Sequence, residues 1–236
     1  MSVVCFSDLH GNYNLWLQIK KYYKENDTLI FLGDAIDRGP DGIKILQEMF
    51  QDKRIIFLLG NHEDMLLKYI DNGIKSSLIT DKEIITCNGS YKTLLDFNEL
   101  NDLDKITLIN NLKNKTKNYY IYINKDKKNI FLSHAGLSFN KIYNFEKNNL
   151  LWDRDHIKID KWNNKYKYWY IVHGHTPIQL LNPNKVIPEI NRYCNRHKID
   201  IDIGTIISKT IAVLNLDTLQ VKYFKEEENN ESRDNE

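Results

Sequence analysis

Short apolar segments alternate with amphipathic ones in the first third of the chain. The apolar runs are residues 2–7, 28–33 and 54–60. They are rich in β-branched and aromatic residues and are short enough to be buried strands. Between and after them, helical patterns predict helices at 12–24, 41–50 and 63–70. This strand–helix alternation is typical of a βαβ layout with parallel strands that are buried on both faces.

The remainder of the chain changes in character. A polar, mixed segment at about 71–115 predicts a helical, cap-like insertion with helices at 91–98 and 102–113. Further strands are predicted at 119–123, 129–133, 168–173, 199–203, 209–215 and 219–224. We interpret the last three as antiparallel neighbours. The sequence therefore predicts one domain at 1–224, with a β-rich layered core and outer helices, followed by an acidic, disordered tail at 225–236.

Composition narrows the class of protein. The chain has 236 residues, a hydrophobic fraction of 42% and a formal net charge of +1. A balanced charge gives no electrostatic reason to expect nucleic acid or an anionic membrane as a partner. The three cysteines are far apart and form no CxxC pair, so no disulfide framework or thiolate zinc site is indicated. With no signal peptide or long apolar run, we expect a cytoplasmic protein. We also expect a monomer.

Five short polar motifs follow strand-like runs. They are SDLHGN (7–12), GDAIDRGP (33–40), GNHED (60–64), SHAG (133–136) and HGHTP (173–177). Each alone has an ordinary explanation, because Asp, Gly and Pro form turns and a single histidine is usually a hydrogen-bonded core residue. Five of them at successive strand ends are not explained by turns. Since sites in open α/β sheets lie at the carboxyl ends of strands, the motifs predict a shared site.

The residue types in these motifs favour a metal centre. Carboxylates and imidazoles without thiolates suit Mn²⁺, Fe or Zn²⁺. A cluster of Asp8, Asp34 and Asp37 would repel itself, and divalent cations would remove that repulsion by favouring the ionised carboxylates. Two ions that share a carboxylate make a hydrolytic site. We therefore expect two divalent ions as cofactors, with Mn²⁺ the first choice.

Together the five motifs resemble those of the phosphoprotein phosphatase family, within the calcineurin-like metallophosphoesterase superfamily. The variants found between Ser7 and Pro177 are most similar to its bacterial and bacteriophage serine/threonine protein phosphatases. The resemblance implies an α/β fold with α/β/β/α layers, in which a central β-sandwich is flanked by helices.

The resemblance also implies roles for individual residues. The metal ligands would be Asp8, His10, Asp34, Asn61, His134 and His175, with Asp34 bridging the two ions. His62 would donate a proton to the leaving oxygen and Asp37 would keep it cationic. Arg38, Arg154 and Asn61 would bind the substrate phosphate, since a guanidinium can contact two phosphate oxygens. His173 would be a neighbour of the site, whereas His156 and His197 lie outside every motif and suggest surface or structural roles.

The implied reaction is in-line attack of a metal-bound hydroxide on phosphorus. As substrate we expect a phosphorylated protein, mainly on Ser or Thr, or a small phosphate ester. The alternative enzyme is a hydrolase of dinucleoside polyphosphates such as diadenosine tetraphosphate, because it would use the same metal set. A non-catalytic module that binds phosphorylated partners is a weaker alternative, because every expected ligand and Asp37, Arg38 and His62 are present. A nuclease is also weaker, given the neutral charge.

Overall fold

The computed structural model describes residues 1–72, 88–137, 145–158, 162–184 and 187–226. Residues 73–87 of the expected insertion and 227–236 of the expected tail lie outside these ranges. Within the described residues, no helix is long and apolar enough to span a membrane.

The first of two five-stranded sheets has the strand order β10-β9-β1-β2-β3. Its bounds are β1 Val3–Phe6, β2 Thr28–Phe31, β3 Ile55–Phe57, β9 Thr210–Asn215 and β10 Val221–Lys225. β1, β2 and β3 run parallel, as their alternation with helices predicts. β9 runs antiparallel to β1, and β10 forms an antiparallel hairpin with β9.

The second sheet has the order β4-β5-β6-β8-β7. Its bounds are β4 Tyr119–Ile123, β5 Asn129–Ser133, β6 Trp169–His173, β7 Asn191–Tyr193 and β8 Lys198–Asp200. β5, β6 and β8 are parallel, while β4 and β7 run antiparallel at the two edges. The carboxyl ends of β5 and β6 therefore point the same way, and His134 and His175 follow them.

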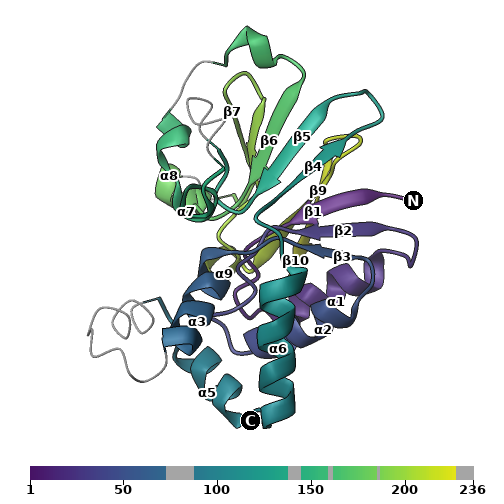
Figure 1. Cartoon of the computed structure of the whole chain (residues 1–236). Coiled ribbons are helices and arrows are strands. Elements are labelled where there is room, and N and C mark those ends of the chain that lie inside the picture. Colours follow the sequence, from purple (N-terminus) through teal and green to yellow (C-terminus); the bar gives the residue numbers. More distant parts are fainter. Residues whose placement is uncertain (73–87, 138–144, 159–161, 185–186, 227–236) are drawn as a thin grey trace, which may run out of the picture.

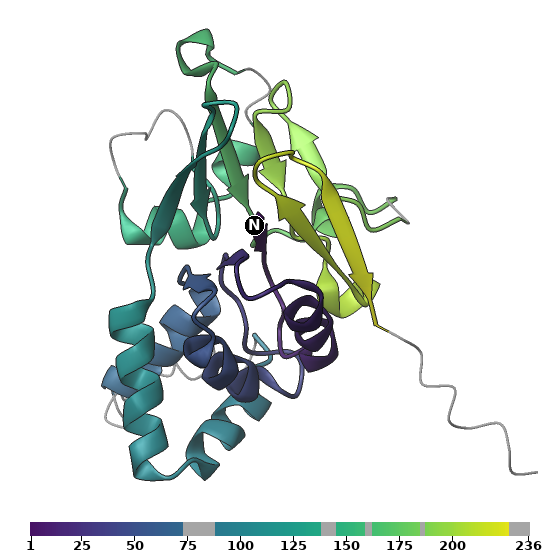
Figure 2. The same cartoon turned by 90° about the vertical axis from the view of Figure 1, so that its right-hand side faces the viewer.

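Helices cover the outer faces of both sheets. Those beside the first sheet are α1 Tyr13–Tyr22, α2 Gly42–Gln51, α3 Asn61–Asn72, α5 Tyr91–Glu99 and α6 Asp102–Lys115. Figures 1 and 2 show them gathered on one side of β1, β2 and β3. Short helices accompany the rest of the chain: α7 Lys147–Trp152, α8 Ile178–Leu181, α9 Thr205–Ser208, and the 3₁₀ turns η3 Asp155–Lys158 and η4 Asn164–Tyr166.

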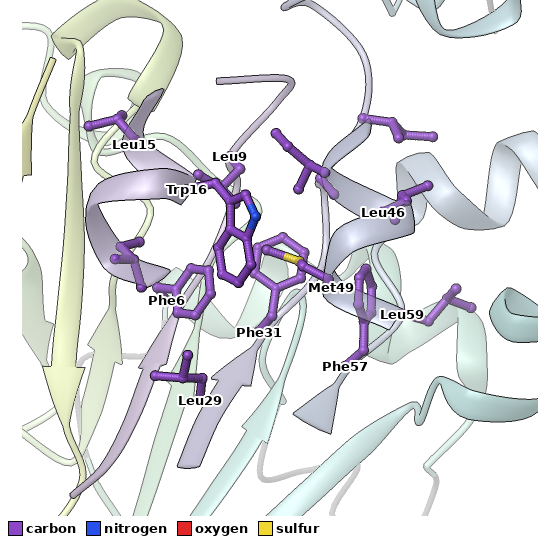
Figure 3. Packing of buried hydrophobic residues seen from close by; sticks show 14 of the residues in the cluster. Phe6, Leu9, Leu15, Trp16, Leu29, Phe31, Leu46, Met49, Phe57 and Leu59 are labelled. Carbon is purple, nitrogen blue, oxygen red and sulfur yellow. The ribbon is translucent and has the colours of Figure 1, made fainter. Parts of the chain in front are cut away.

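Alternate side chains of the apolar strands enter two different cores. In β1, Val4 and Phe6 point toward the helices, whereas Val3 and Cys5 point toward the second sheet. The helix-side core contains stacked and tilted aromatic rings, with Phe31 5.1 Å from Phe6 between centroids (Figure 3). The buried residues between the sheets are aliphatic apart from Cys5, and tyrosines of β4 and β6 pack at the margin. Burial on both faces explains why these strands are uniformly apolar, and the α/β/β/α prediction is confirmed.

The described part of the insertion belongs to the helical layer. α5 and α6 pack against α2, and Phe97, Leu108 and Leu112 join the core beside the first sheet. The first residues after the undescribed gap also reach the Asp37 loop, because Arg38 N–H donates to the Gly89 carbonyl over 2.9 Å.

One prediction about strand pairing is wrong. Residues 199–203 were expected to lie beside 209–215, but β8 belongs to the second sheet and runs parallel to β6. Its hairpin partner, β7, was not predicted at all. The turn that joins them is made by Cys194, Asn195 and Arg196 with φ of 50°, 55° and 67°, and it contains no glycine. The usual sequence signal of a hairpin turn is therefore missing.

Candidate dinuclear metal site

The five motifs meet where the carboxyl ends of strands from both sheets come together. Backbone hydrogen bonds tie the loops to one another: Asp8 N–H donates to Gly33 O over 3.0 Å, and His10 N–H donates to Asp34 O over 2.9 Å. In the second sheet, Gly174 N–H donates to His134 O over 2.8 Å. Between the sheets, His175 N–H donates to Asp8 Oδ2 over 3.1 Å, so motifs that are more than 160 residues apart in the chain form one site.

The backbone of these loops is unusual. Six non-glycine residues of the site have a left-handed conformation, with positive φ: Asp8 (55°), His10 (45°), Asp34 (65°), Asp37 (70°), Arg38 (68°) and His175 (73°). Such conformations cost free energy for residues with a Cβ atom and concentrate at functional sites. The loops therefore bend sharply at the strand ends and turn these side chains inward.

The first cluster contains buried His10 with Asp8 and Asp34. His10 donates from Nδ1 to the Ile36 carbonyl over 3.0 Å, which fixes the tautomer and leaves Nε2 with its lone pair. That Nε2 lies 3.8 Å from Asp8 Oδ1 and 3.8 Å from Asp34 Oδ2. Burial lowers the pKa of His10 to about 3, so the ring is neutral, as a metal ligand must be.

The second cluster contains Asp34, Asn61, His134 and His175. His134 donates from Nδ1 to the Leu32 carbonyl over 2.8 Å, and its Nε2 lies 2.7 Å from Asn61 Oδ1 and 3.4 Å from Asp34 Oδ2. His175 Nδ1 lies 2.9 Å from the same Asn61 oxygen. The other nitrogen of His175, Nε2, is buried and has no hydrogen-bond partner among the described residues.

Asp34 joins the two clusters. The groups His10–Asp34–His62 and Asp34–His134–His175 each have ligand atoms within 4.8 Å of one another. Although burial opposes it, the charges of His134 and His62 hold the pKa of Asp34 well below its usual value. Against the effect of burial, Asp34 in turn raises the pKa of His134 to about 9. A convergent set of buried carboxylates, imidazoles and one amide oxygen fits two divalent ions, and suits Mn²⁺, Fe and Zn²⁺ alike.

His62 and Asp37 form a buried pair beside the first cluster. His62 Nδ1 donates to Asp37 Oδ2 over 2.5 Å, and His62 Nε2 lies 3.7 Å from Asp34 Oδ2. Despite burial, the carboxylates of Asp34 and Asp37 raise the pKa of His62, which favours the protonated ring. A protonated ring could act as an acid, although His62 also groups with His10 and Asp34 as a potential metal ligand. Its expected role as the acid stays a prediction.

Both arginines that were predicted to bind phosphate are exposed. Arg38 is exposed, with Nη1 2.9 Å from His10 Nε2 and Nη2 3.3 Å from His62 Nε2. Arg154 is exposed just after α7. Burial lowers the pKa of His175 to about 2, and the charges of His134 and Arg154 act in the same direction. The roles of both arginines in phosphate binding stay predictions.

The sequence motifs did not reveal the residues that hold the ligands in place. Glu63 is fully buried and accepts backbone N–H bonds from Asp34 (2.9 Å), Ala35 (2.7 Å) and Gly60 (3.1 Å). Its position three residues after Gly60, which precedes α3, is that of a capping-box glutamate, and this signal was available in GNHED. No motif indicated Ser90 and Thr93, which bond the side chain and the backbone of Asp37.

Comparison with known proteins identifies the family. A family model described as calcineurin-like phosphoesterase matches residues 1–203. A symmetrical bis(5'-nucleosyl)-tetraphosphatase of Buchnera aphidicola (subspecies Schizaphis graminum) is 32% identical over 181 residues, or 72% of this chain. That match spans 60% of the relative's length. The asymmetrical bis(5'-nucleosyl)-tetraphosphatase PrpE of Oceanobacillus iheyensis is 24% identical and is matched over 89% of this chain and 87% of its own length.

Solved structures show the same fold. The cold-active protein-tyrosine phosphatase of a psychrophilic Shewanella has a TM-score of 0.56 and 18% sequence identity, with coverage of 94% of this chain and 77% of that one. At this level of identity the likeness concerns the fold alone, so it does not distinguish a protein phosphatase from a nucleotide hydrolase.

Proposed function

The chain belongs to the calcineurin-like phosphoesterase family, and we propose that it is a dinuclear metal-dependent hydrolase of dinucleoside polyphosphates, of the diadenosine tetraphosphate type. The observation that carries the choice of substrate is the pair of relatives in which this activity is named, one of them matched over most of both chains. The protein serine/threonine phosphatase becomes the second candidate, and the resemblance of the five motifs supports it.

The described residues support the chemistry as follows. Two bound divalent ions would supply an activated water and neutralise phosphate charge. Asp34 would belong to both ion sites, and the neutral amide of Asn61 would keep the total charge acceptable to an anionic substrate. Arg38 and Arg154 would orient phosphate oxygens. His62, kept cationic by Asp37, would protonate the leaving oxygen.

A side-by-side assay tests the substrate. The purified chain with added Mn²⁺ is given diadenosine tetraphosphate, a phosphoserine peptide and a phosphotyrosine peptide, and an Asp34→Asn preparation controls for contaminating phosphatases. We expect the highest kcat/KM for the dinucleotide. The products also identify the cleaved bond, since symmetrical cleavage gives two ADP and asymmetrical cleavage gives ATP and AMP. A clear preference for either peptide would contradict the dinucleotide hydrolase and favour a protein phosphatase.

The remaining expectations become part of the same proposal. We infer one catalytic domain at 1–224, a monomeric state, and neither nucleic acid nor membrane as a partner. A cytoplasmic location fits a nucleotide substrate. Size-exclusion chromatography with light scattering tests the monomer, and a mass of about twice 28.0 kDa would contradict it.

A further inference from the structure

A buried cluster of aromatic side chains lies beside the second metal cluster, and the chemistry proposed above does not use it. His156 and His173 are fully buried, and Tyr193 is half-buried. The rings of His156 and His173 meet edge to face, with centroids 4.8 Å apart. We call His156, His173 and Tyr193 the aromatic network. They come from three separate elements, η3, β6 and β7.

Polar contacts connect the aromatic network from the Ala135 carbonyl to the Gly174 carbonyl. The Tyr193 hydroxyl lies 2.6 Å from His173 Nε2 and 3.2 Å from His156 Nδ1. His156 Nε2 lies 2.6 Å from the Ala135 carbonyl, and His173 Nδ1 lies 3.0 Å from the Gly174 carbonyl. Because a carbonyl only accepts, His156 donates from Nε2 to Ala135.

The outermost contacts of the network are to Ala135 and Gly174, which lie in the two loops that carry His134 and His175. Ala135 follows His134 directly, and Gly174 precedes His175. The aromatic network therefore contacts the backbone of both loops, while the ring nitrogens of His134 and His175 lie 3.2 Å apart.

The loop after His134 packs closely against the aromatic network. Gly136 has φ +87°, and a Cβ atom there would lie 2.7 Å from His156 Nε2 and 3.1 Å from His173 Cδ2. Buried Lys198 donates to the Leu137 carbonyl over 3.1 Å and to the His156 carbonyl over 3.2 Å. The loop is thus fixed at Ala135 and Leu137 and packed tightly between them. Packing this close leaves His134 little freedom to shift.

We propose that the aromatic network is a positioning device for the second metal ion: His156, Tyr193 and His173 hold the loops of His134 and His175 at the separation that the ion requires. This inference rests on the two-ion hydrolase proposed above. Partners that orient metal-ligating groups from behind commonly change metal affinity by roughly ten- to hundredfold when they are removed.

The test is metal binding without substrate, measured by calorimetric titration with Mn²⁺. Tyr193→Phe removes only the central hydroxyl and keeps the ring. Tyr122→Phe is the matched control, because it removes a tyrosine hydroxyl that donates to Asp217 over 2.8 Å in the other part of the second sheet. We expect two ions in the wild type, and in Tyr193→Phe one ion of unchanged affinity and one weakened by roughly ten- to hundredfold. Activity should return at saturating Mn²⁺.

A second pair of variants separates positioning from folding. His156→Gln keeps an N–H donor that can reach Ala135, whereas His156→Ala does not, so Gln should retain more of the second-ion affinity. The melting temperature of each ion-free variant reports folding separately.

Two results would overturn the proposal: equal Mn²⁺ affinities in Tyr193→Phe and Tyr122→Phe, or fewer than two ions in the wild type. The second would also overturn the two-ion function. If the Mn²⁺ titrations give the expected result but diadenosine tetraphosphate is not hydrolysed, only the proposed substrate is overturned.

Discussion

At the scale of residues, Asp34 and His62 are neighbours with different contacts. Asp34 is the one carboxylate shared by both groups of potential ligands among the described residues. His62 has one nitrogen bonded to Asp37 and the other directed toward Asp34. The position of the motifs at strand ends predicts a shared site, whereas the ligand roles come from the family resemblance and stay predictions. The contacts that bring His134 next to Asn61 depend on how two sheets pack, which no local spacing encodes.

Replacing His62 by Asn tests proton donation. We expect kcat to fall by about 10²–10⁴-fold while metal content, measured by elemental analysis, stays near two ions per chain. The loss should be greater for a phosphoserine peptide than for a dinucleotide, because an alkoxide is a poorer leaving group than a nucleotide phosphate. Loss of one ion in this variant would instead make His62 a ligand.

Asp34→Asn should be the most damaging single substitution in the site. The change removes a negative charge from both groups of ligands, so both ions should bind more weakly and turnover should be lost. Mn²⁺ titration and the dinucleotide assay measure the two effects. A variant that keeps full activity would rule out a shared carboxylate.

At the scale of elements, the parallel strands and their helices were predictable, and the second sheet was less so. β1 to β3 are apolar on both faces and are separated by clear helical patterns. β7 has three half-buried residues and a turn with no glycine, so neither periodicity nor turn chemistry marks it. Without β7, the adjacent β8 was assigned to the wrong neighbour.

α3 supports the Asp34 loop through Glu63, and Glu63→Gln tests that support. The amide nitrogen of Gln cannot accept, so at least one of the three backbone N–H groups now bonded to Glu63 loses its partner. We expect the free energy of unfolding, measured with urea, to fall by about 1–3 kcal/mol. Glu99→Gln at the exposed end of α5 is the control and should change little. Equal stability of the two variants would contradict the role of Glu63.

At the scale of the whole molecule, the site lies where the two sheets meet. Asp8, His10, Asp34 and Asn61 follow strands of the first sheet, whereas His134 and His175 follow strands of the second. An ion bound by ligands from both sheets joins them in the folded state only, because the unfolded chain does not hold these ligands together.

Manganese should therefore stabilise the fold. One site that is saturated at a hundred times its Kd adds about 2.7 kcal/mol to the free energy of unfolding. The melting temperature should rise with Mn²⁺ concentration and fall on chelation, as differential scanning calorimetry can measure. Asp34→Asn should show a much flatter dependence. A wild-type melting temperature independent of Mn²⁺ would be incompatible with binding across the sheets.

The left-handed backbone at Asp8, Asp37, His175 and the other residues of these loops has a consequence for engineering. Each such conformation costs on the order of 1–3 kcal/mol, and glycine adopts it without strain. Glycine at these positions would relax the ion-free chain while removing the group that does the chemistry. A library screened for heat resistance alone would drift toward inactive variants, so stabilised forms must be selected with a turnover assay at every round.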